Sequence, residues 1–272
     1  MRALFGLLLL ATGCPRDPGP QPAIDRPGVL LGELTWLEAE RVLGPDTIVV
    51  IPLGAASKEH GPHLRLDNDW QLAEYFKRRV LDTSAVVVAP TIGYHHYPAF
   101  VEYPGSINLR ADVARDLVVD VCASLAAYGP RRFYVLNTGV STVPPLRDAA
   151  AELASRGILM EFTDLLRTLE PVERTLAQQR GGTHADELET SMMLYIAPDR
   201  VDMSKAVDDW RPKQGKGFNR EPGGAGTWSA SGVWGDATLA TVEKGRVLVE
   251  ALAAGIEADL ARLRSTPLPI TP

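Results

Sequence analysis

The chain has 272 residues and a formal net charge of −6, with 45% hydrophobic and 23% charged residues. This composition is ordinary for a globular domain and provides enough apolar residues for a sizeable core. The negative charge and the lack of a long Lys/Arg run argue against nucleic-acid binding, because phosphates require a basic face. Two cysteines are too few for a disulfide framework.

The first 13 residues predict a signal peptide. Arg2 supplies a positive charge, and the apolar run from Ala3 to Ala11 is too short to span a bilayer. Small residues then precede Cys14, as in bacterial lipoproteins, so we expect a lipidated Cys14 on an exported protein anchored at the periplasmic face or cell surface. The alternative is an ordinary cleaved signal with an incidental cysteine. Residues 14–27 are proline-rich and are expected to form a tether.

One α/β domain is predicted for residues 28–265, followed by a short tail at 266–272. Apolar runs alternate with helical patterns, which is typical of a parallel or mixed sheet covered by helices. The predicted strands are Thr47–Leu53, Ala85–Pro90, Arg132–Asn137 and Gly157–Phe162. The predicted helices are Asp69–Leu81, Ala111–Tyr128, Pro145–Arg156, Asp186–Ile196 and Ala237–Arg264. A Gly-rich insertion with three tryptophans is expected at residues 208–234.

The five histidines have an informative distribution. His60 and His63 follow the first predicted strand, His95 and His96 follow the second, and His184 begins a predicted helix. In open α/β sheets, ligands bind beyond the carboxyl ends of the strands. Four histidines in two such loops therefore favour a metal or acid–base site over isolated surface residues.

Carboxylates accompany the first pair of histidines. Glu59 adjoins His60, a Gly-Pro turn follows, and Asp69 begins the next predicted helix. Carboxylate and imidazole ligands suit zinc, manganese or iron, and the absence of a nearby thiolate disfavours a structural zinc site. Asp69 taken alone is better explained as a helix cap, and only its neighbours favour a role in metal binding.

Four blocks of sequence resemble the creatininase (creatinine amidohydrolase) family, in the family's order: Gly54–Asp69, Tyr103–Ser106, His184–Ser191 and Gly235–Gly245. The resemblance implies a three-layer α/β/α sandwich with a mainly parallel central sheet, commonly assembled as a homohexamer. It also implies a two-metal site that hydrolyses amide C–N bonds in small, often cyclic molecules.

The resemblance also suggests roles for individual residues. His60 matches the metal-binding histidine, and Asp69 matches the aspartate that bridges the two metals. Glu59 is the nearest carboxylate to the metal-binding glutamate, although the family places that glutamate two residues before the histidine. His184 matches the proposed proton shuttle, and Glu189 is an acid of the same helix. We therefore expect one or two zinc, manganese or iron ions per chain and a small-molecule amide substrate.

One block departs from the family pattern. After the third core strand the family reads Asn-Gly-His-Gly-Gly-Asn, whereas this chain has Gly139 in place of the histidine. We expect His96, or less readily His95, to supply the missing imidazole. The alternatives are that both are surface residues and that the site holds one metal or none. A metal-poor, inactive binding lipoprotein with the same fold is therefore the second functional hypothesis.

Five further residues are predicted to line the substrate pocket: Lys58, Tyr94, His95, Trp228 and Trp234. Together with Trp210, these tryptophans flank the Gly-rich segment Gly223–Gly226, which is consistent with a mobile lid and equally with a pinned surface loop. Lys58 is expected near an anionic substrate group, unless it is solvated.

Overall fold

The central sheet has five parallel strands in the order β1-β3-β2-β4-β5. The computed structural model describes residues 27–270. The strands are β1 Val29–Leu30, β2 Ile48–Leu53, β3 Val87–Val88, β4 Arg132–Asn137 and β5 Leu159–Phe162. Arg132–Asn137 was predicted to the residue, and the other predicted strands are trimmed at their ends.

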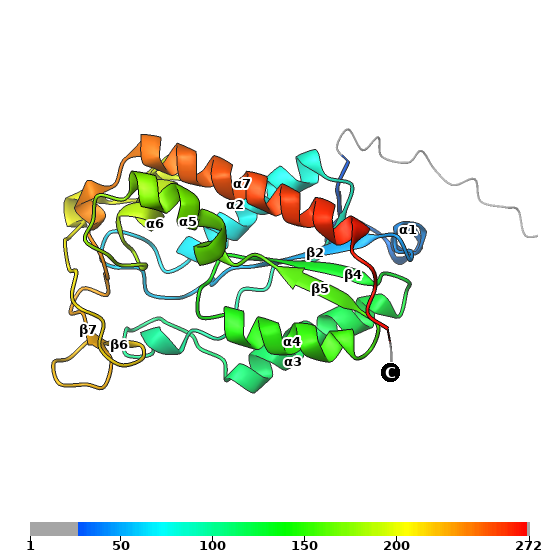
Figure 1. The fold of residues 1–272 in the computed structure, drawn as a ribbon, viewed down its shortest axis with the longest axis horizontal. Helices are drawn as coiled ribbons and strands as arrows, with labels where there is room; N and C mark the ends of the chain where they lie inside the picture. The colour runs from blue at the N-terminus through cyan, green and yellow to red at the C-terminus, as the bar shows by residue number, and fades with distance from the viewer. Residues whose placement is uncertain (1–26, 271–272) are drawn as a thin grey trace, which may run out of the picture.

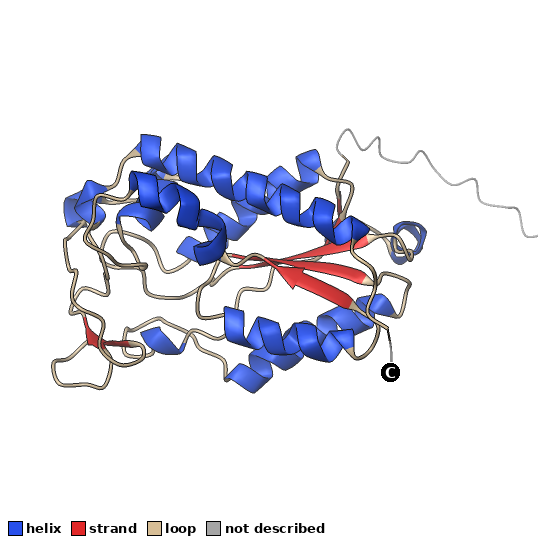
Figure 2. Ribbon diagram, viewed as in Figure 1, coloured by secondary structure: helices blue, strands red, loops and turns tan. Residues whose placement is uncertain are grey.

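Helices cover both faces of this sheet and make the expected α/β/α sandwich (Figures 1 and 2). On one face lie α2 Asn68–Thr83, α5 Leu165–Leu176, α6 Glu187–Ile196 and α7 Val242–Ser265. On the other lie α3 Ala111–Ala126 and α4 Val143–Ala154, with α1 Trp36–Val42 at one end. The short pair β6 Phe218–Asn219 and β7 Thr227–Trp228 belongs to the predicted insertion.

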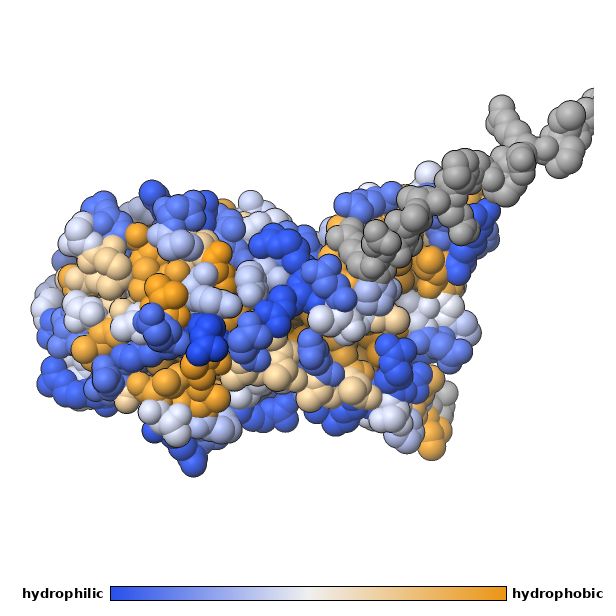
Figure 3. Space-filling model, turned by 90° about the horizontal axis from the view of Figure 1, so that it is seen from above, coloured by the Kyte–Doolittle hydropathy of each residue, from blue (hydrophilic) through white to orange (hydrophobic). Residues whose placement is uncertain are grey.

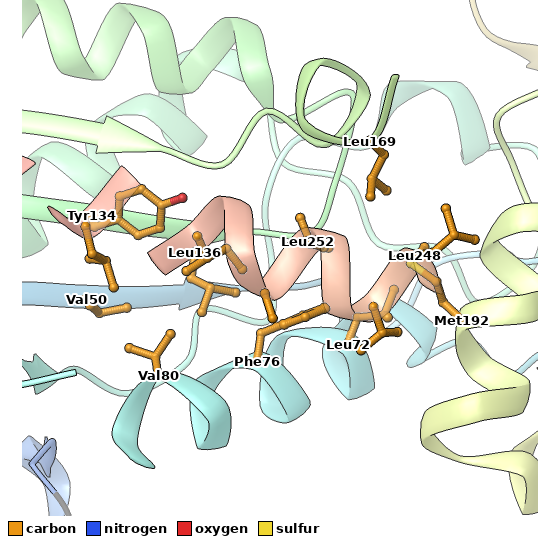
Figure 4. Packing of buried hydrophobic residues seen from close by; sticks show 14 of the residues in the cluster. Val50, Leu72, Phe76, Val80, Tyr134, Leu136, Leu169, Met192, Leu248 and Leu252 are labelled. Carbon is orange, nitrogen blue, oxygen red and sulfur yellow. The ribbon is translucent and has the colours of Figure 1, made fainter. Parts of the chain in front are cut away.

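Strand β2 is buried on both faces, as its continuous apolar sequence predicts. Its alternate side chains enter two different cores, so that Val50 belongs to the core of α2, α6 and α7, whereas Val49 and Ile51 belong to the core of α3 and α4. Figure 4 shows the first core, where Phe76 of α2 and Leu252 of α7 pack against the sheet. Burial on both faces fixes β2 at the centre of the sheet.

Strands β2 and β4 are hydrogen-bonded neighbours, and the strand that follows each of them in sequence is added on opposite sides of this pair. The chain leaves β2 for α2 on one face and leaves β4 for α4 on the other. Adjacent strands whose connections part in this way leave a crevice at their carboxyl ends, where α/β proteins bind ligands. The loops after β2 and β4 are those that carry His60 and Gly139.

Two helices were not predicted. Helix α1 is short, and Thr35 is its N-cap. The Thr35 side chain accepts a hydrogen bond from the Glu38 amide, and the Glu38 carboxylate accepts one from the Thr35 amide, which makes a capping box. Helix α5 carries Pro171 in its interior, and such a proline normally argues against a helix. The predicted last helix begins later than expected, because residues 237–239 form a separate 3₁₀ turn before α7.

The outer surface of the α2/α7 layer mixes polar and hydrophobic residues (Figure 3). Its larger hydrophobic areas lie toward the end of the molecule that holds α6 and the insertion. Within residues 27–270, no helix is both long enough and apolar enough to cross a membrane. The predicted signal peptide and most of the tether lie outside the described residues.

Candidate metal and acid–base site

The loop after β2 is held in shape by the Tyr103–Ser106 turn. Ser57 Oγ donates a hydrogen bond to the Gly105 carbonyl at 2.6 Å, and the Glu59 amide donates to Ser106 Oγ at 3.0 Å. The Lys58 amide donates to the Leu66 carbonyl at 2.8 Å, which closes the loop on itself. Two of the blocks that resemble the creatininase family therefore pack together, and one of them positions Glu59.

His60 is fully buried and has both ring nitrogens engaged. Nδ1 lies 2.8 Å from the Lys58 carbonyl, which can only accept, so Nδ1 carries a proton. Nε2 lies 2.8 Å from Asp69 Oδ1 and 3.5 Å from Glu189 Oε1. Burial and the Lys58 ammonium lower the pKa of His60. The Asp69 and Glu189 carboxylates raise it by more, so the net pKa is raised to about 9. The backbone contact at Nδ1 directs Nε2 to the carboxylates, as is usual for a histidine that binds a metal.

Asp69 lies in the first turn of α2 but does not cap it. Its Oδ1 faces His60 and its Oδ2 lies 2.8 Å from Lys58 Nζ. Its backbone carbonyl accepts a hydrogen bond from Thr138 Oγ1, at 2.9 Å, so the loop after β4 supports this residue. Burial raises the pKa of Asp69. The charges of Lys58 and His60 lower it by more, so the net pKa is lowered and the carboxylate is ionised.

The start of α6 places Glu189. Asp186 caps the helix by accepting hydrogen bonds from the amides of Leu188 and Glu189, at 3.1 and 3.0 Å. Ala185 has a positive φ of 47°, which costs a non-glycine residue about 1 kcal/mol. Its amide donates to Glu189 Oε2 at 2.7 Å. This strained turn brings the Glu189 carboxylate back toward His184.

His184 and Glu59 form a second buried pair. His184 Nε2 lies 3.0 Å from Glu59 Oε2, and the other carboxylate oxygen accepts a hydrogen bond from the Gly61 amide. Gly232 comes so close to Glu59 that an added Cβ would lie 1.9 Å from Oε1. Burial raises the pKa of Glu59. The neighbouring His184 lowers it by more, so the net pKa is lowered and this carboxylate is ionised beside the imidazole.

The five residues predicted for the site therefore converge. The ligand atoms of His60, His184 and Glu189 all lie within 4.8 Å of one another, and Asp69 and Glu59 flank them. Two imidazoles and ionised carboxylates in this spacing suit one zinc, manganese or iron ion. Among the described residues, no second group of three histidine, cysteine or acidic ligands lies within such a distance.

A cavity of about 250 Å³ opens beside this cluster. Lys58, His184 and Glu189 line it, together with Thr138 and Ser141 from the loop after β4. Its apolar lining includes Leu72, Phe100, Leu165, Leu169, Leu188, Met192, Phe218 and Trp234. The pocket is therefore mostly hydrophobic, with a few charged side chains among its lining.

The predicted pocket residues divide into two groups. Lys58 and Trp234 line the cavity, whereas Tyr94, His95 and Trp228 do not. Tyr94 is 50% exposed and His95 is completely buried. Trp228 lies beneath the Arg211 guanidinium, 4.2 Å from it, in a separate surface hollow. The prediction that these three residues line the pocket is therefore wrong.

The prediction that His96 replaces the missing imidazole is also wrong. His96 Nδ1 lies 2.9 Å from the Leu109 carbonyl, and His96 is not part of the ligand cluster. Tyr97, the next residue, lies near Gly139: an added Cβ there would lie 3.6 Å from Tyr97 Cε1 and 3.0 Å from the Thr142 side chain. The loop after β3 therefore contributes an aromatic ring to this region and no imidazole.

Several cavity residues were not predicted. Phe218 and Lys213 come from the insertion, and Glu173 comes from α5. Burial, followed by the nearby Asp186 and Glu170 carboxylates, raises the pKa of Glu173 to about 7. The proline inside α5 obscured this helix in the sequence, so nothing there marked Glu173 as a cavity residue.

Comparison with known proteins gives consistent matches. The model of the creatininase family, described as creatinine amidohydrolase, matches residues 32–260. The chain is 28% identical over 258 residues to creatinine amidohydrolase from Pseudomonas putida, with 88% of this chain and 98% of the relative covered. It is 27% identical over 227 residues to a mycofactocin precursor peptide peptidase from Mycobacterium ulcerans, with 80% and 86% covered.

The fold comparison agrees with the sequence matches. A crystal structure of creatinine amidohydrolase superposes with a TM-score of 0.73 at 25% identity, covering 88% of this chain and 98% of that one. The shared architecture therefore extends over nearly the whole domain.

Proposed function

Because the chain belongs to the creatininase family, we propose that it is a metal-dependent amidohydrolase that cleaves a C–N amide bond of a small molecule bound in the cavity. One observation carries the proposal: His60, Asp69, Glu189, His184 and Glu59 converge beside a mostly apolar cavity, which His184 and Glu189 line.

The relatives support this reaction class. Similar solved creatininases include a manganese form, a form described as Zn-Zn type and a mutant complexed with creatine. The curated relatives include an amidohydrolase, a peptidase and a 3-dehydro-scyllo-inosose hydrolase from Thermotoga maritima. Small amides, cyclic ones among them, are therefore the first substrates to test.

His60, Asp69 and Glu189 would hold the metal ion. Nε2 of His60 and one oxygen of each carboxylate already face one another across the cluster. A bound divalent ion lowers the pKa of water and polarises a carbonyl oxygen. Metal binding requires His60 to release the Nε2 proton, which the adjacent carboxylates otherwise stabilise.

His184 is assigned to proton transfer. Its Nε2 is held by Glu59, which leaves Nδ1 as the basic nitrogen. An imidazole at this position can accept a proton from an attacking water and return it to the departing amide nitrogen. Glu59 orients the ring and stabilises its protonated form, while Phe100 packs against the ring with centroids 4.3 Å apart.

The remaining walls of the cavity contact the substrate and exclude water. Phe100, Phe218 and Trp234 give the cavity an aromatic side that suits a flat or cyclic substrate. The volume of about 250 Å³ admits a small molecule and excludes a folded protein.

Turnover of a small amide by the metal-loaded protein tests the proposal. The purified chain, loaded with Mn²⁺ or Zn²⁺, should hydrolyse at least one member of a panel of cyclic and linear amides, and EDTA should abolish this activity. A His184→Asn variant is the negative control, since it keeps the fold and removes the base. Tight binding of panel members with no turnover under either metal would favour the inactive binding protein, which the glycine at position 139 supports.

A further inference from the structure

Lys58 lies beside the ligand cluster, and the proposed reaction does not use it. Its side chain is buried, with the residue only 5% exposed, and it lines the cavity. Its Nζ lies 2.8 Å from Asp69 Oδ2, 4.8 Å from the centroid of the Phe100 ring and 5.7 Å from that of Tyr97. A buried ammonium is costly unless it is paired, so its place between a carboxylate and two aromatic faces is well defined.

This placement commits both oxygens of Asp69. Oδ1 faces His60, on the side of the cluster that suits a metal ion, and Oδ2 faces Lys58. An ion bridged through Asp69 to a second metal would need Oδ2, and the Lys58 ammonium already occupies that position. No other histidine, cysteine or acidic group of the described residues completes a second site there.

The charges of the cluster lead to the same conclusion. Glu59, Asp69 and Glu189 carry three negative charges, and one divalent ion together with Lys58 carries three positive ones. A second divalent ion would leave an excess of two positive charges in a buried site, which low dielectric penalises strongly. One relative is described as Zn-Zn type, and the charges in this chain disfavour that arrangement.

The loop after β4 also lacks a ligand for a second metal ion at position 139. Gly139 offers no ligand, and Tyr97 lies against it. The ring of Tyr97 also lies 5.7 Å from Lys58 Nζ, the group that faces Asp69 Oδ2. Lysine is suited to this position, because its ammonium is a compact point charge at the end of a flexible stem.

We propose that the Lys58 ammonium is the second cation of the centre, so that the protein binds one divalent ion per chain where a two-metal relative binds two. The inference rests on the proposed function and deepens it. Lys58 holds Asp69 in place and presents a fixed positive charge to the cavity, where it can stabilise the oxygen of a substrate carbonyl as negative charge develops.

Metal counting tests the proposal without any substrate. Equilibrium dialysis of the purified chain against Mn²⁺, followed by mass-spectrometric metal analysis, should give one ion per wild-type chain at saturation. Lys58→Glu removes the ammonium and adds a carboxylate beside Asp69, so this variant should bind two. The matched control is Lys77→Glu, which changes a lysine paired with Glu74 on α2 and should leave the count at one.

The outcomes separate the two proposals. Two ions in the wild-type protein would overturn the role of Lys58 and leave the amidohydrolase proposal intact. No bound ion would overturn both the metal dependence and the one-ion assignment. A count of one for folded Lys58→Glu would also contradict the inference. The wild-type count does not depend on any variant folding, and circular dichroism identifies a variant that does not fold.

Discussion

Glu59 Oε2 and His184 Nε2 lie 3.0 Å apart, although 125 positions separate the two residues in the chain. One comes from the loop after β2 and the other from the turn before α6. Different contacts position the two residues. The Ser106 hydroxyl and the Gly61 amide form hydrogen bonds with Glu59, and the strained turn at Ala185 follows His184 directly. The pair joins the two halves of the site.

His60→Ala should remove most of the bound metal, because it deletes the imidazole whose Nε2 faces Asp69 and Glu189. The loss of one ligand should weaken metal binding by at least about 100-fold, comparable with or greater than the loss caused by removing an outer-shell partner. His96→Ala is the matched control, since His96 contacts the Leu109 carbonyl outside the cluster. Dialysis against Mn²⁺ measures both. Equal metal loss in the two variants would contradict the ligand assignment.

His184→Asn should lower kcat by about 10²–10⁴-fold on any substrate found, because it removes the general base and leaves the cavity in place. Glu59→Gln should have a smaller effect, about 10–100-fold, since the amide can still hold the ring but no longer stabilises its positive charge. Steady-state kinetics on the metal-loaded proteins distinguishes the two. A larger loss for Glu59→Gln than for His184→Asn would reverse the roles proposed here.

Glu173 should make the protein less stable as the pH rises. Burial, together with Asp186 and Glu170, raises its pKa from 4.5 to about 7, so the folded state favours the protonated acid. The resulting stabilisation is present below about pH 4.5 and is lost as the pH rises through about 7. At pH 8 Glu173→Gln should therefore raise the free energy of unfolding by about 1–2 kcal/mol relative to the wild type, after discounting for solvent screening.

Urea unfolding at several pH values checks this prediction. The difference between Glu173→Gln and the wild type should disappear near pH 4. The exposed Glu257 on α7 provides the control, because Glu257→Gln should show no comparable dependence. A stability difference that stays constant from pH 4 to pH 8 would show that Glu173 does not titrate in this range.

Export and lipidation of Cys14 remain predictions, since this cysteine lies outside the described residues. The expressed full-length protein should fractionate with membranes, and Cys14→Ser should release it or leave its signal uncleaved. Metabolic labelling with a fatty-acid analogue reports the modification directly. Wild-type protein that remains unlabelled and wholly in the soluble fraction would contradict the prediction.

Strands and helices with strong periodicity were predictable, because burial on both faces or on one stripe leaves a continuous or periodic apolar pattern. The strand at Arg132–Asn137 is the clearest case. Helix α5 was not predictable in the same way, since Pro171 interrupts its pattern, although Leu169 packs in the same core as α7. The edge strand β1, with two residues, is too short to give any periodic signal.

The sequence by itself determined the ligand types, since Glu59, His60, Asp69, His184 and Glu189 stand in loops or helix starts where chemistry, and no core pattern, accounts for them. Only the tertiary structure decided what surrounds them. Neighbouring residues such as His96 and Tyr97 differ in direction because of backbone geometry that no local pattern encodes, so Tyr97 lies beside Gly139 and His96 does not. The pairing of Lys58 with Asp69 was equally hidden, because whether a lysine in a loop is solvated or buried depends on elements distant in sequence, here Phe100 and Tyr97, that close over it.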